Sequence, residues 1–330
     1  NSLATPKTRK PPTHTPLPPP NHPPPTPPPP PNIVKWIKEQ ENRAENSVDD
    51  ILISYDFQAG TYYDLYVNKA TDYNYDLEHG KIAETISSYL DRICLERKSM
   101  SSHGLSIMEC GVGEATTFSG VLKRLDISKL SRILGFDVSW SRIKYADKCL
   151  KKMNTEEIYH KVQLFTADMF QIPMKDNSID LVYTAYSVEP NGGKEKEILE
   201  ELYRVTGEYL ILVEPAFELA GEDARKRMLE HGYVTQLYDT AFKLGYHVLS
   251  YELLHADINQ LNPTGVMIIK KGAAKKNDAK LCCPISKQYL QKCNGALYCK
   301  ESFLAYPILK GIPCLLEDNA IIATKWENFE

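Results

Sequence analysis

The stretch that decides the fold is IMECGVGEATT, residues 107–117, in which two glycines join an apolar segment to a helical pattern. Residues 104–108 are apolar enough for a short buried strand, and residues 115–125 carry apolar side chains at helical spacing. A strand, a tight turn and a helix bring backbone N–H groups to one point, which is typical of nucleotide-binding turns. Gly111 and Gly113 can adopt positive φ or admit a ligand close to the backbone because neither carries a Cβ.

A Gly-x-Gly pair alone does not distinguish a cofactor turn from an ordinary strand-to-helix loop. The dinucleotide fingerprint has a third glycine where this chain has Thr116. The turn therefore differs from the usual NAD turn. The choice between the two interpretations depends on whether the rest of the chain supplies the other walls of a cofactor pocket.

Composition narrows the class of protein. A chain of 330 residues can hold one large domain and a small one. The net charge of −4 argues against a surface built wholly for nucleic acid, although it does not exclude a local basic patch. Neither a run of 18 apolar residues nor a signal-peptide core occurs in the sequence. We therefore expect a cytoplasmic protein whose eight cysteines are unpaired.

The N-terminal segment is rich in proline, with 15 of the 22 prolines in residues 1–32. Such a segment favours polyproline II or disorder, because proline cannot form helix interiors or sheet ladders. It is interpreted either as a stiff spacer or as a docking peptide for a Pro-binding domain of a partner. Residues 1–48 are predicted to be this disordered tail and a linker, residues 49–272 an α/β domain, and residues 273–330 a linker and a small accessory domain.

Residues 79–269 alternate between strand and helix patterns. Strands are expected at residues 104–108, 131–137, 161–166, 180–185, 209–214, 245–250 and 266–269, with helices at 79–97, 115–125, 139–151, 195–205, 219–230 and 234–244. This order predicts a seven-stranded, mostly parallel sheet with helices on both faces. Only a loop separates the last two strands, so we expect them to pair antiparallel at one edge.

Three strand ends carry an acidic residue. Glu109 closes the first strand, Asp137 closes the second, and Asp168 follows the third. Ligands of open α/β sheets bind at the carboxyl ends of the strands. Asp137 lies 24 residues after Gly113, the usual place for a carboxylate that accepts both ribose hydroxyls. Asp168 can accept from an adenine amino group while the apolar Met169 flanks the ring.

Four segments in order carry a resemblance to a known family: ECGVG at 109–113, GFDVS at 135–139, TADMFQIP at 166–173 and SIDLVYTAYSVE at 178–189. Together, over residues 55–271, they resemble the class I S-adenosylmethionine-dependent methyltransferases. The resemblance implies a Rossmann-like fold and S-adenosyl-L-methionine as the cofactor. It also implies that residues 58–63, an aromatic segment, form a lid over the bound ligand.

The resemblance further implies which residues contact the cofactor. The expected set is Tyr62, Glu109, Gly111, Gly113, Asp137, Val138, Asp168, Met169 and Thr184. The glycines would line the methionine part, and residues 184–186 would lie near the reactive methyl group. The chain departs from the family pattern at Val112 and at Pro190, where many members carry His. Pro190 makes proton transfer by a histidine at that point untenable.

A general base is needed if the acceptor is a hydroxyl group that must lose its proton. Tyr186 and Glu189 are taken as the catalytic candidates. Further candidates are Glu214, at the end of the fifth strand, and two histidines, His231 and His255.

The C-terminal residues 281–313 are predicted to form two knuckles and a hairpin. Zinc knuckles need C-x₂-C pairs, but Ser286 and Ser302 stand where the second thiols would be. Over residues 279–325 the segment resembles the small zinc-ribbon-like activator subunit of tRNA and translation-factor methyltransferases, most clearly at AYPI, residues 305–308. The resemblance implies a fused accessory domain, and the missing thiols predict that it holds no metal.

The leading hypothesis is methyl transfer from S-adenosylmethionine to a small molecule, such as a sugar or glycan precursor. Methylation of tRNA or protein is the alternative that the ribbon resemblance favours. A non-catalytic scaffold with a cofactor-type fold is a further alternative. An NAD-dependent oxidoreductase is disfavoured by Thr116.

Overall fold

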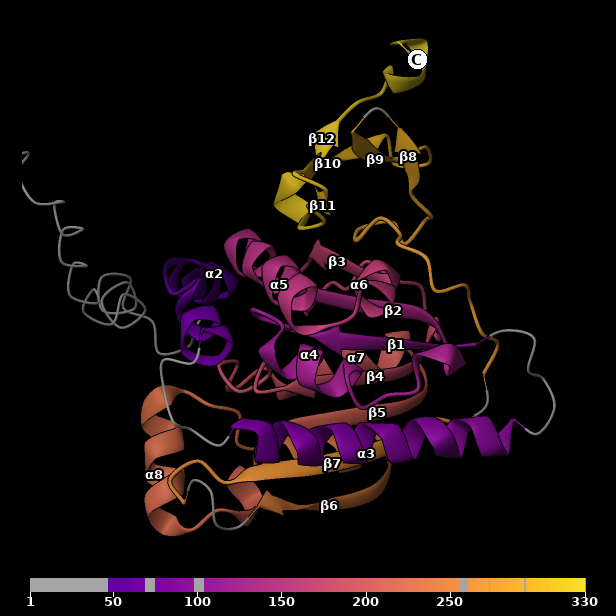
Figure 1. Ribbon diagram of the computed structural model, residues 1–330. Helices are drawn as coiled ribbons and strands as arrows, with labels where there is room; N and C mark the ends of the chain where they lie inside the picture. Colours follow the sequence, from indigo (N-terminus) through magenta and orange to yellow (C-terminus); the bar gives the residue numbers. More distant parts are fainter. Residues whose placement is uncertain are drawn as a thin grey trace, which may run out of the picture.

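The computed structural model of the chain describes residues 47–68, 75–97, 104–255, 260–272, 274–293 and 295–329 (Figure 1). The proline-rich segment and its proposed docking role, residues 1–32, lie outside these ranges. Over the described ranges, no helix is both long and apolar enough to cross a membrane. Among the described residues, no disulfide joins any of the eight cysteines.

A seven-stranded sheet forms the centre of the molecule. Its strands are β1 (Leu105–Cys110), β2 (Leu130–Asp137), β3 (Val162–Thr166), β4 (Ile179–Ala185), β5 (Thr206–Pro215), β6 (His247–His255) and β7 (Thr264–Lys270). The order across the sheet is β3-β2-β1-β4-β5-β7-β6. Strands β1 to β5 run parallel, while β7 is antiparallel to both β5 and β6. The predicted mostly parallel sheet and its antiparallel edge are confirmed.

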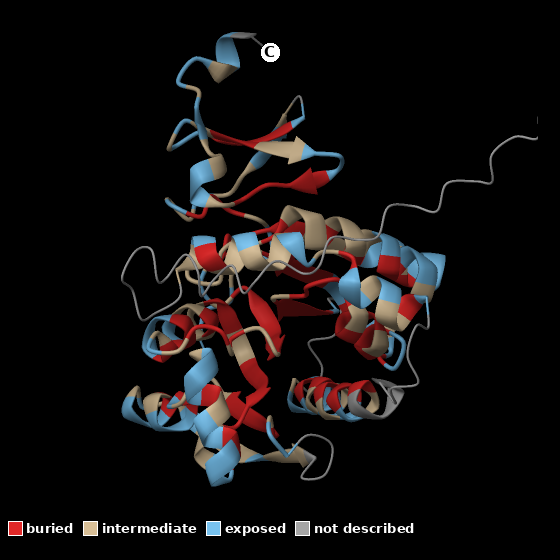
Figure 2. Ribbon diagram, turned by 90° about the vertical axis from the view of Figure 1, so that its left-hand side faces the viewer, coloured by how far each residue is buried: buried red, intermediate tan, exposed pale blue. Residues whose placement is uncertain are grey.

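Helices cover both faces of the sheet. They are α2 (Val48–Phe57), α3 (Tyr75–Glu96), α4 (Thr116–Leu122), α5 (Trp140–Met153), α6 (Glu156–Lys161), α7 (Glu195–Val205), α8 (Glu222–His231) and α9 (Leu237–Lys243). Buried side chains of α3, α4 and α5 form one core with the sheet, and those of α7 and α9 form another. Figure 2 shows the buried stripe of these helices turned towards the buried strands. Apolar residues at helical spacing produce this stripe.

The strand order places the candidate ligand site. After β1 the chain builds β2 and β3 on one side, and then crosses to build β4 and β5 on the other. Ligands of such sheets bind where the order reverses, outside the carboxyl ends of the central strands. Glu109 of β1 pairs with Gly135 of β2 and Tyr183 of β4. The ends of the three strands therefore meet at the point where the glycine turn begins.

A small β-rich module follows the main domain and packs on the β3 edge of its sheet (Figure 1). Its strands are β8 (Gln291–Cys293), β9 (Ala296–Cys299), β10 (Leu304–Leu309), β11 (Ile312–Pro313) and β12 (Ile321–Ile322). Thr166 forms a parallel bridge with Cys314, and the Leu315 N–H donates to the Thr166 carbonyl at 2.9 Å. Tyr306 and Phe165 are buried in one shared core. The module thus continues the sheet and its core.

The four knuckle positions of this module gather at one point. The Cys283 thiol lies 3.7 Å from the Ser302 hydroxyl and 3.3 Å from the Tyr306 hydroxyl. The Ser286 hydroxyl lies 3.5 Å from the Cys299 sulfur. Among the described residues, no three His, Cys, Asp or Glu side chains are grouped as a metal site would require. Hydrogen bonds between thiols and hydroxyls connect the two knuckles.

Candidate active site

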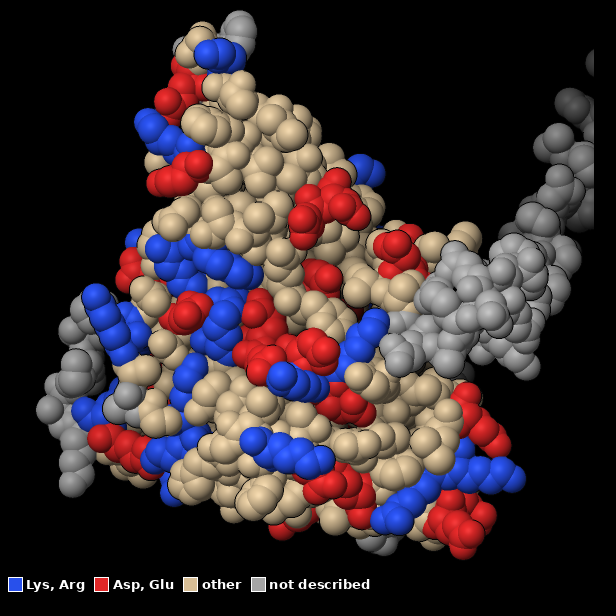
Figure 3. Space-filling view, turned by 180° about the vertical axis from the view of Figure 1, so that it is seen from behind, with Lys and Arg blue, Asp and Glu red and all other residues tan. Residues whose placement is uncertain are grey.

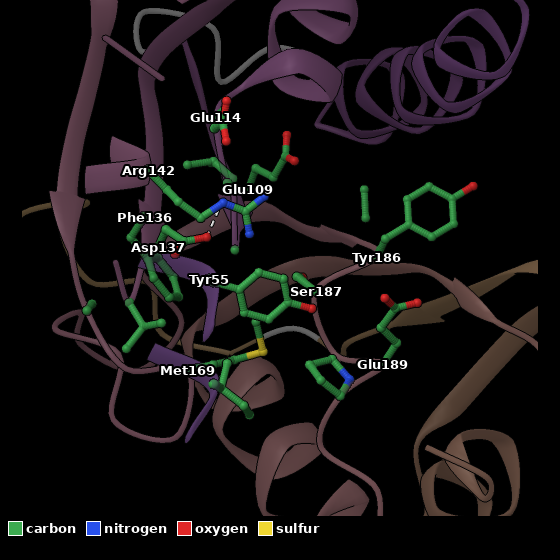
Figure 4. Close-up of a pocket in the computed structure, with 18 of the residues that line it drawn as sticks. Tyr55, Glu109, Glu114, Phe136, Asp137, Arg142, Met169, Tyr186, Ser187 and Glu189 are labelled. Atoms are coloured by element: carbon green, nitrogen blue, oxygen red, sulfur yellow. Dashed lines mark hydrogen bonds between the residues drawn. The ribbon is translucent and has the colours of Figure 1, made fainter. Parts of the chain in front are cut away.

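A cavity lies at the carboxyl ends of β1, β2, β3 and β4 (Figure 4). Of the residues expected from the sequence, those lining it are Tyr62, Glu109, Gly111, Gly113, Asp137, Val138, Asp168, Met169, Tyr186 and Glu189. Thr184 is buried within β4 and does not line the cavity, whose wall begins one residue later, at Ala185. The structure therefore brings the strand-end acids and the glycine turn to one site.

The glycine turn is shaped by its backbone and by its neighbours. Gly111 has φ +78° and Gly113 has φ +53°, a region that residues with a Cβ rarely adopt. The N–H groups of Gly111 and Val112 both donate to the Phe136 carbonyl, at 2.9 and 2.8 Å. A Cβ on Gly111 would lie 2.3 Å from the Ser187 Cβ. Glycine is thus required there by conformation and by space.

Asp137 joins the turn to the next helix. One carboxylate oxygen accepts from the Gly113 N–H at 3.0 Å, and the other accepts from the Ser139 N–H at 2.9 Å. The side chain is only 7% exposed. A carboxylate has about four acceptor positions, so these two bonds fix its orientation and leave room for two further donors. This is the fixed acid that a ribose diol requires.

Asp168 begins the adjacent wall. Its carboxylate accepts from the Phe170 N–H at 2.9 Å, which folds residues 168–170 into a tight turn. Met169 and Phe170 line the cavity beside it. Burial raises the pKa of Asp168 above its usual value. An acidic edge flanked by two large apolar side chains suits a flat heterocycle with an amino group.

The expected lid is held down by Glu114, which the sequence reasoning had not singled out. One oxygen of its buried carboxylate accepts from the Gly60 N–H at 3.0 Å, and the other accepts from the Tyr63 N–H at 2.6 Å. The segment is helical only in part: α2 ends at Phe57, and a short π-helix (Tyr63–Val67) follows a turn. Because Glu114 directly follows the glycine turn, the expected lid is attached to that turn.

A second attachment joins α2 to α5. Asp56 accepts from the Ser139 hydroxyl at 2.6 Å and from the Ser141 hydroxyl at 3.0 Å. The Arg142 guanidinium lies 4.8 Å from the centre of the Tyr55 ring and 5.3 Å from that of Tyr62. Cations over aromatic faces are attracted by the ring quadrupole. These contacts fix Tyr55 of α2 and Tyr62 of the expected lid as walls of the cavity.

Two buried carboxyl groups, Glu109 and Glu214, and the half-buried carboxyl group of Glu189 have raised pKa values. Burial raises the pKa of Glu109 to about 8, although the Tyr183 hydroxyl donates to it. Burial also raises the pKa of Glu214, at the end of β5, to about 7. Burial and the nearby Glu214 raise the pKa of Glu189 to about 8. Groups with pKa values this close to neutrality can exchange protons during catalysis.

The candidate bases differ in their positions. The Tyr186 hydroxyl lies 3.0 Å from the Thr264 hydroxyl, and the ring points away from the glycine turn (Figure 4). Glu214 accepts from the backbone N–H groups of Ser187 and Glu189 at 3.1 and 3.2 Å, so it holds the loop after β4. His231 is exposed and does not line the cavity, and the side chain of His255 lies outside the described residues.

Comparison with known proteins identifies the central domain. Residues 107–208 match the family model described as a methyltransferase domain. No curated protein matches the chain. The match spans the glycine turn, all three acidic strand ends and β4, which contribute to the cavity.

Several solved structures are similar in fold. A magnesium protoporphyrin IX methyltransferase from Synechocystis PCC 6803, with bound SAH, has 13% identity and a TM-score of 0.46, covering 67% of this chain and 99% of that one. The methyltransferase domain of bacterial CtHen1 has 17% identity and a TM-score of 0.43, covering 59% and 100%. A complex of the Haloferax volcanii Trm112 methyltransferase activator with a putative methyltransferase has 13% identity and a TM-score of 0.43, covering 66% and 99%. At these identities no residue role is transferred.

The domain match and the cavity together define the class. The match supports S-adenosylmethionine-dependent methyltransferase activity for the domain that holds the cavity, whose centre is the mostly parallel seven-stranded sheet.

Proposed function

We propose that the chain transfers a methyl group from S-adenosylmethionine to a hydroxyl group of a small molecule, such as a sugar or glycan precursor. The observation that carries the proposal is the meeting of the Gly111–Gly113 turn, Asp137 and Asp168 around one cavity. In this assignment Asp137 accepts from the ribose hydroxyls and Asp168 accepts from the adenine amino group. Thr184 supports the wall from inside β4.

The residues present fit this cofactor. A Cβ on Gly113 would lie 2.8 Å from the Arg142 guanidinium, so this side chain packs directly on the glycine turn, and both residues line the cavity. The Nε of Arg142 is buried and has no hydrogen-bond partner among the described residues. An unpaired buried donor is costly, and a polar ligand in this cavity would satisfy it. Glu109 also lines the cavity, in β1 just before the glycine turn.

The bound cofactor supplies a methyl group on a positively charged sulfur. The work of the protein is then to align acceptor oxygen, methyl carbon and sulfur, and to exclude water. The lid segment attached by Glu114 and Asp56 provides the exclusion. We assign Glu189 as the group that receives the acceptor proton, because it lines the cavity and is not bound to Thr264 as Tyr186 is.

Two features support a small acceptor over RNA or protein. Tyr55 of α2 and Tyr62 of the lid border the cavity, and their bulk favours an acceptor small enough to enter beside them. On the face seen in Figure 3, Lys and Arg alternate with Asp and Glu, whereas a nucleic-acid surface is continuously basic. Methylation of tRNA or protein remains the alternative function. With methyl-labelled cofactor and a cell extract, label in RNA or protein would favour it.

The C-terminal module is proposed as an accessory to the same active site. Its backbone joins Thr166, two residues before Asp168, so it supports the end of β3 that bears the adenine wall. The likeness of its AYPI segment to an activator subunit points to the same role.

Calorimetric titration with S-adenosylhomocysteine tests the proposed cofactor site. We expect binding by the wild type and a loss of at least tenfold in Asp137→Ala. Asp91→Ala is the control, because Asp91 is exposed on α3 and its ion partner is Lys129. No binding by the wild type, or equal binding by Asp137→Ala, would overturn the proposal. Binding without transfer to any acceptor would favour the non-catalytic scaffold.

A further inference from the structure

Two buried polar atoms at the Glu189 side of the active site have no partner. They are Nη1 of Arg227, on α8, and Oδ1 of Asn262, in the loop before β7. Among the described residues neither atom makes a hydrogen bond. Buried polar groups in folded proteins are nearly always paired, and exceptions mark places where a ligand or water completes the bonding. Both residues lie around Glu189, which lines the cavity.

The position of these side chains is set by backbone contacts. The loop after β4 packs directly on the loop after α8: the Gly192 N–H donates to the Gly232 carbonyl at 3.1 Å. The Val234 N–H donates to the Glu189 carbonyl at 3.0 Å. A Cβ on Gly192 would lie 2.6 Å from the Gly232 and Tyr233 carbonyl oxygens. This close approach holds Tyr233 beside Glu189.

Arg227 and Asn262 approach Glu189 from two other elements. The Arg227 guanidinium carbon lies 5.9 Å from the centre of the Tyr233 ring, and its side chain hydrogen-bonds the Tyr233 hydroxyl. The Asn262 side chain is within hydrogen-bonding range of the Glu189 carboxyl. No direct ion pair joins Arg227 to Glu189, although both are described. The Nη1 donor of Arg227 therefore has no acceptor, and the guanidinium forms no ion pair with the nearby Glu189 carboxyl group.

The chemistry of the three groups defines a complementary ligand. A guanidinium N–H is matched best by an oxyanion, and a carboxamide oxygen by a hydroxyl or amine donor. Tyr55 and Tyr62 line the cavity, so part of its wall is aromatic. Burial keeps Glu189 largely protonated at neutral pH, which lessens its repulsion of an anion.

We infer that Arg227, Asn262 and Glu189 form the acceptor subsite, and that the acceptor carries a carboxylate or phosphate besides the hydroxyl that is methylated. This inference rests on the proposed function, since it places the acceptor next to the proposed methyl position. In the transfer the carbon–sulfur bond of the cofactor breaks and a carbon–oxygen bond forms. The hydroxyl proton passes to Glu189 in the fraction of molecules in which this carboxyl group is ionised, and the electron pair of the broken bond stays on sulfur, which becomes neutral.

The test uses calorimetry to measure how tightly small-molecule probes bind to the full chain saturated with S-adenosylhomocysteine. The probes are glucuronate and glucose 6-phosphate, each compared with glucose, and 4-hydroxybenzoate compared with 4-hydroxybenzyl alcohol. We expect at least one anionic probe to bind tenfold or more tightly than its neutral counterpart. Comparing the carboxylate probes with the phosphate probe shows which oxyanion the subsite binds.

Arg227→Gln should abolish the preference for the anionic probe while S-adenosylhomocysteine still binds. Lys226→Ala is the matched control, because Lys226 is the exposed neighbouring cation on α8 and should leave the preference unchanged. Equal binding of anionic and neutral probes, absence of binding by all probes, or an unchanged preference in Arg227→Gln would overturn the inference. Failure of the wild type to bind S-adenosylhomocysteine would instead refute the proposed function. The two failures are therefore distinguishable.

Discussion

The replacement Gly111→Ala tests the geometry of the glycine turn most directly. Gly111 has φ +78°, and a Cβ there would lie 2.3 Å from the Ser187 Cβ and 2.8 Å from its Oγ. Gly245 is a matched control, because it has φ +75° and an added Cβ would meet nothing within 4 Å. Both replacements impose the same backbone strain. Only the first also forces Ser187 away from the turn.

The expected magnitudes follow from these two contributions. Left-handed backbone costs a residue with a Cβ about 1–2 kcal/mol. Overpacking a filled position costs about 1–3 kcal/mol more. Gly245→Ala should therefore lower the free energy of unfolding by the first amount alone, and Gly111→Ala by roughly 2–5 kcal/mol in total. The Ser187 hydroxyl donates to the Cys110 carbonyl at 2.7 Å, so its displacement also disturbs the end of β1.

Thermal unfolding and calorimetric titration with S-adenosylhomocysteine measure both effects. We expect Gly111→Ala to melt at a lower temperature than Gly245→Ala and to lose at least tenfold in affinity, while Gly245→Ala keeps wild-type affinity. Adding Ser187→Gly should recover part of the stability of Gly111→Ala, because it removes the atom met at 2.3 Å. Equal melting temperatures of the two alanine variants, or wild-type affinity in Gly111→Ala, would refute the reasoning.

Three further predictions follow from the site. Glu114→Ala removes the acceptors of two lid N–H groups, and each of these hydrogen bonds is worth about 1.5–3 kcal/mol. Limited proteolysis should therefore cut residues 55–63 faster in this variant. Glu84→Ala, at an exposed position, is the control and should not change the digestion pattern. Burial raises the pKa values of Glu189 and Glu214 to about 8 and 7, so the folded chain binds more protons than the unfolded chain. The free energy of unfolding should therefore fall as pH rises from about 5 to 8. Glu189→Gln removes one of the two groups, so its melting temperature should fall less steeply with pH than that of the wild type. An equally steep fall in the variant would contradict this assignment. Glu189→Gln should lower kcat for hydroxyl methylation by about a hundredfold or more, whereas Tyr186→Phe should stay within about threefold; similar losses in both variants would count against Glu189 as the proton acceptor.

The fold could be predicted because its signals are local. Each strand of the sheet is a short apolar run bounded by turn residues, and the alternation with helices implies parallel pairing. The antiparallel edge followed from the missing helix between the last two strands. The acids at positions 109, 137 and 168 could be placed together because the carboxyl ends of parallel strands meet at one edge.

Other parts of the site carried weaker signals. Glu114 follows the glycine turn directly, but the sequence does not show that its carboxylate reaches back to Gly60 and Tyr63. Thr184 belongs to a segment expected at the methyl group, yet the cavity wall starts at the next residue. Where a strand ends is uncertain by a few residues from sequence alone, and one residue changes which face a side chain takes.

The sequence by itself determined the proposed cofactor side of the cavity: the Gly111–Gly113 turn and the acids at successive strand ends. Each of these features depends on a few neighbouring residues and on the geometry of a parallel sheet. Only the tertiary structure decided the opposite side, where Arg227 and Asn262 come from separate elements to surround Glu189. Their proximity is set by how α8 and the loops pack on the sheet, and no local spacing encodes that packing.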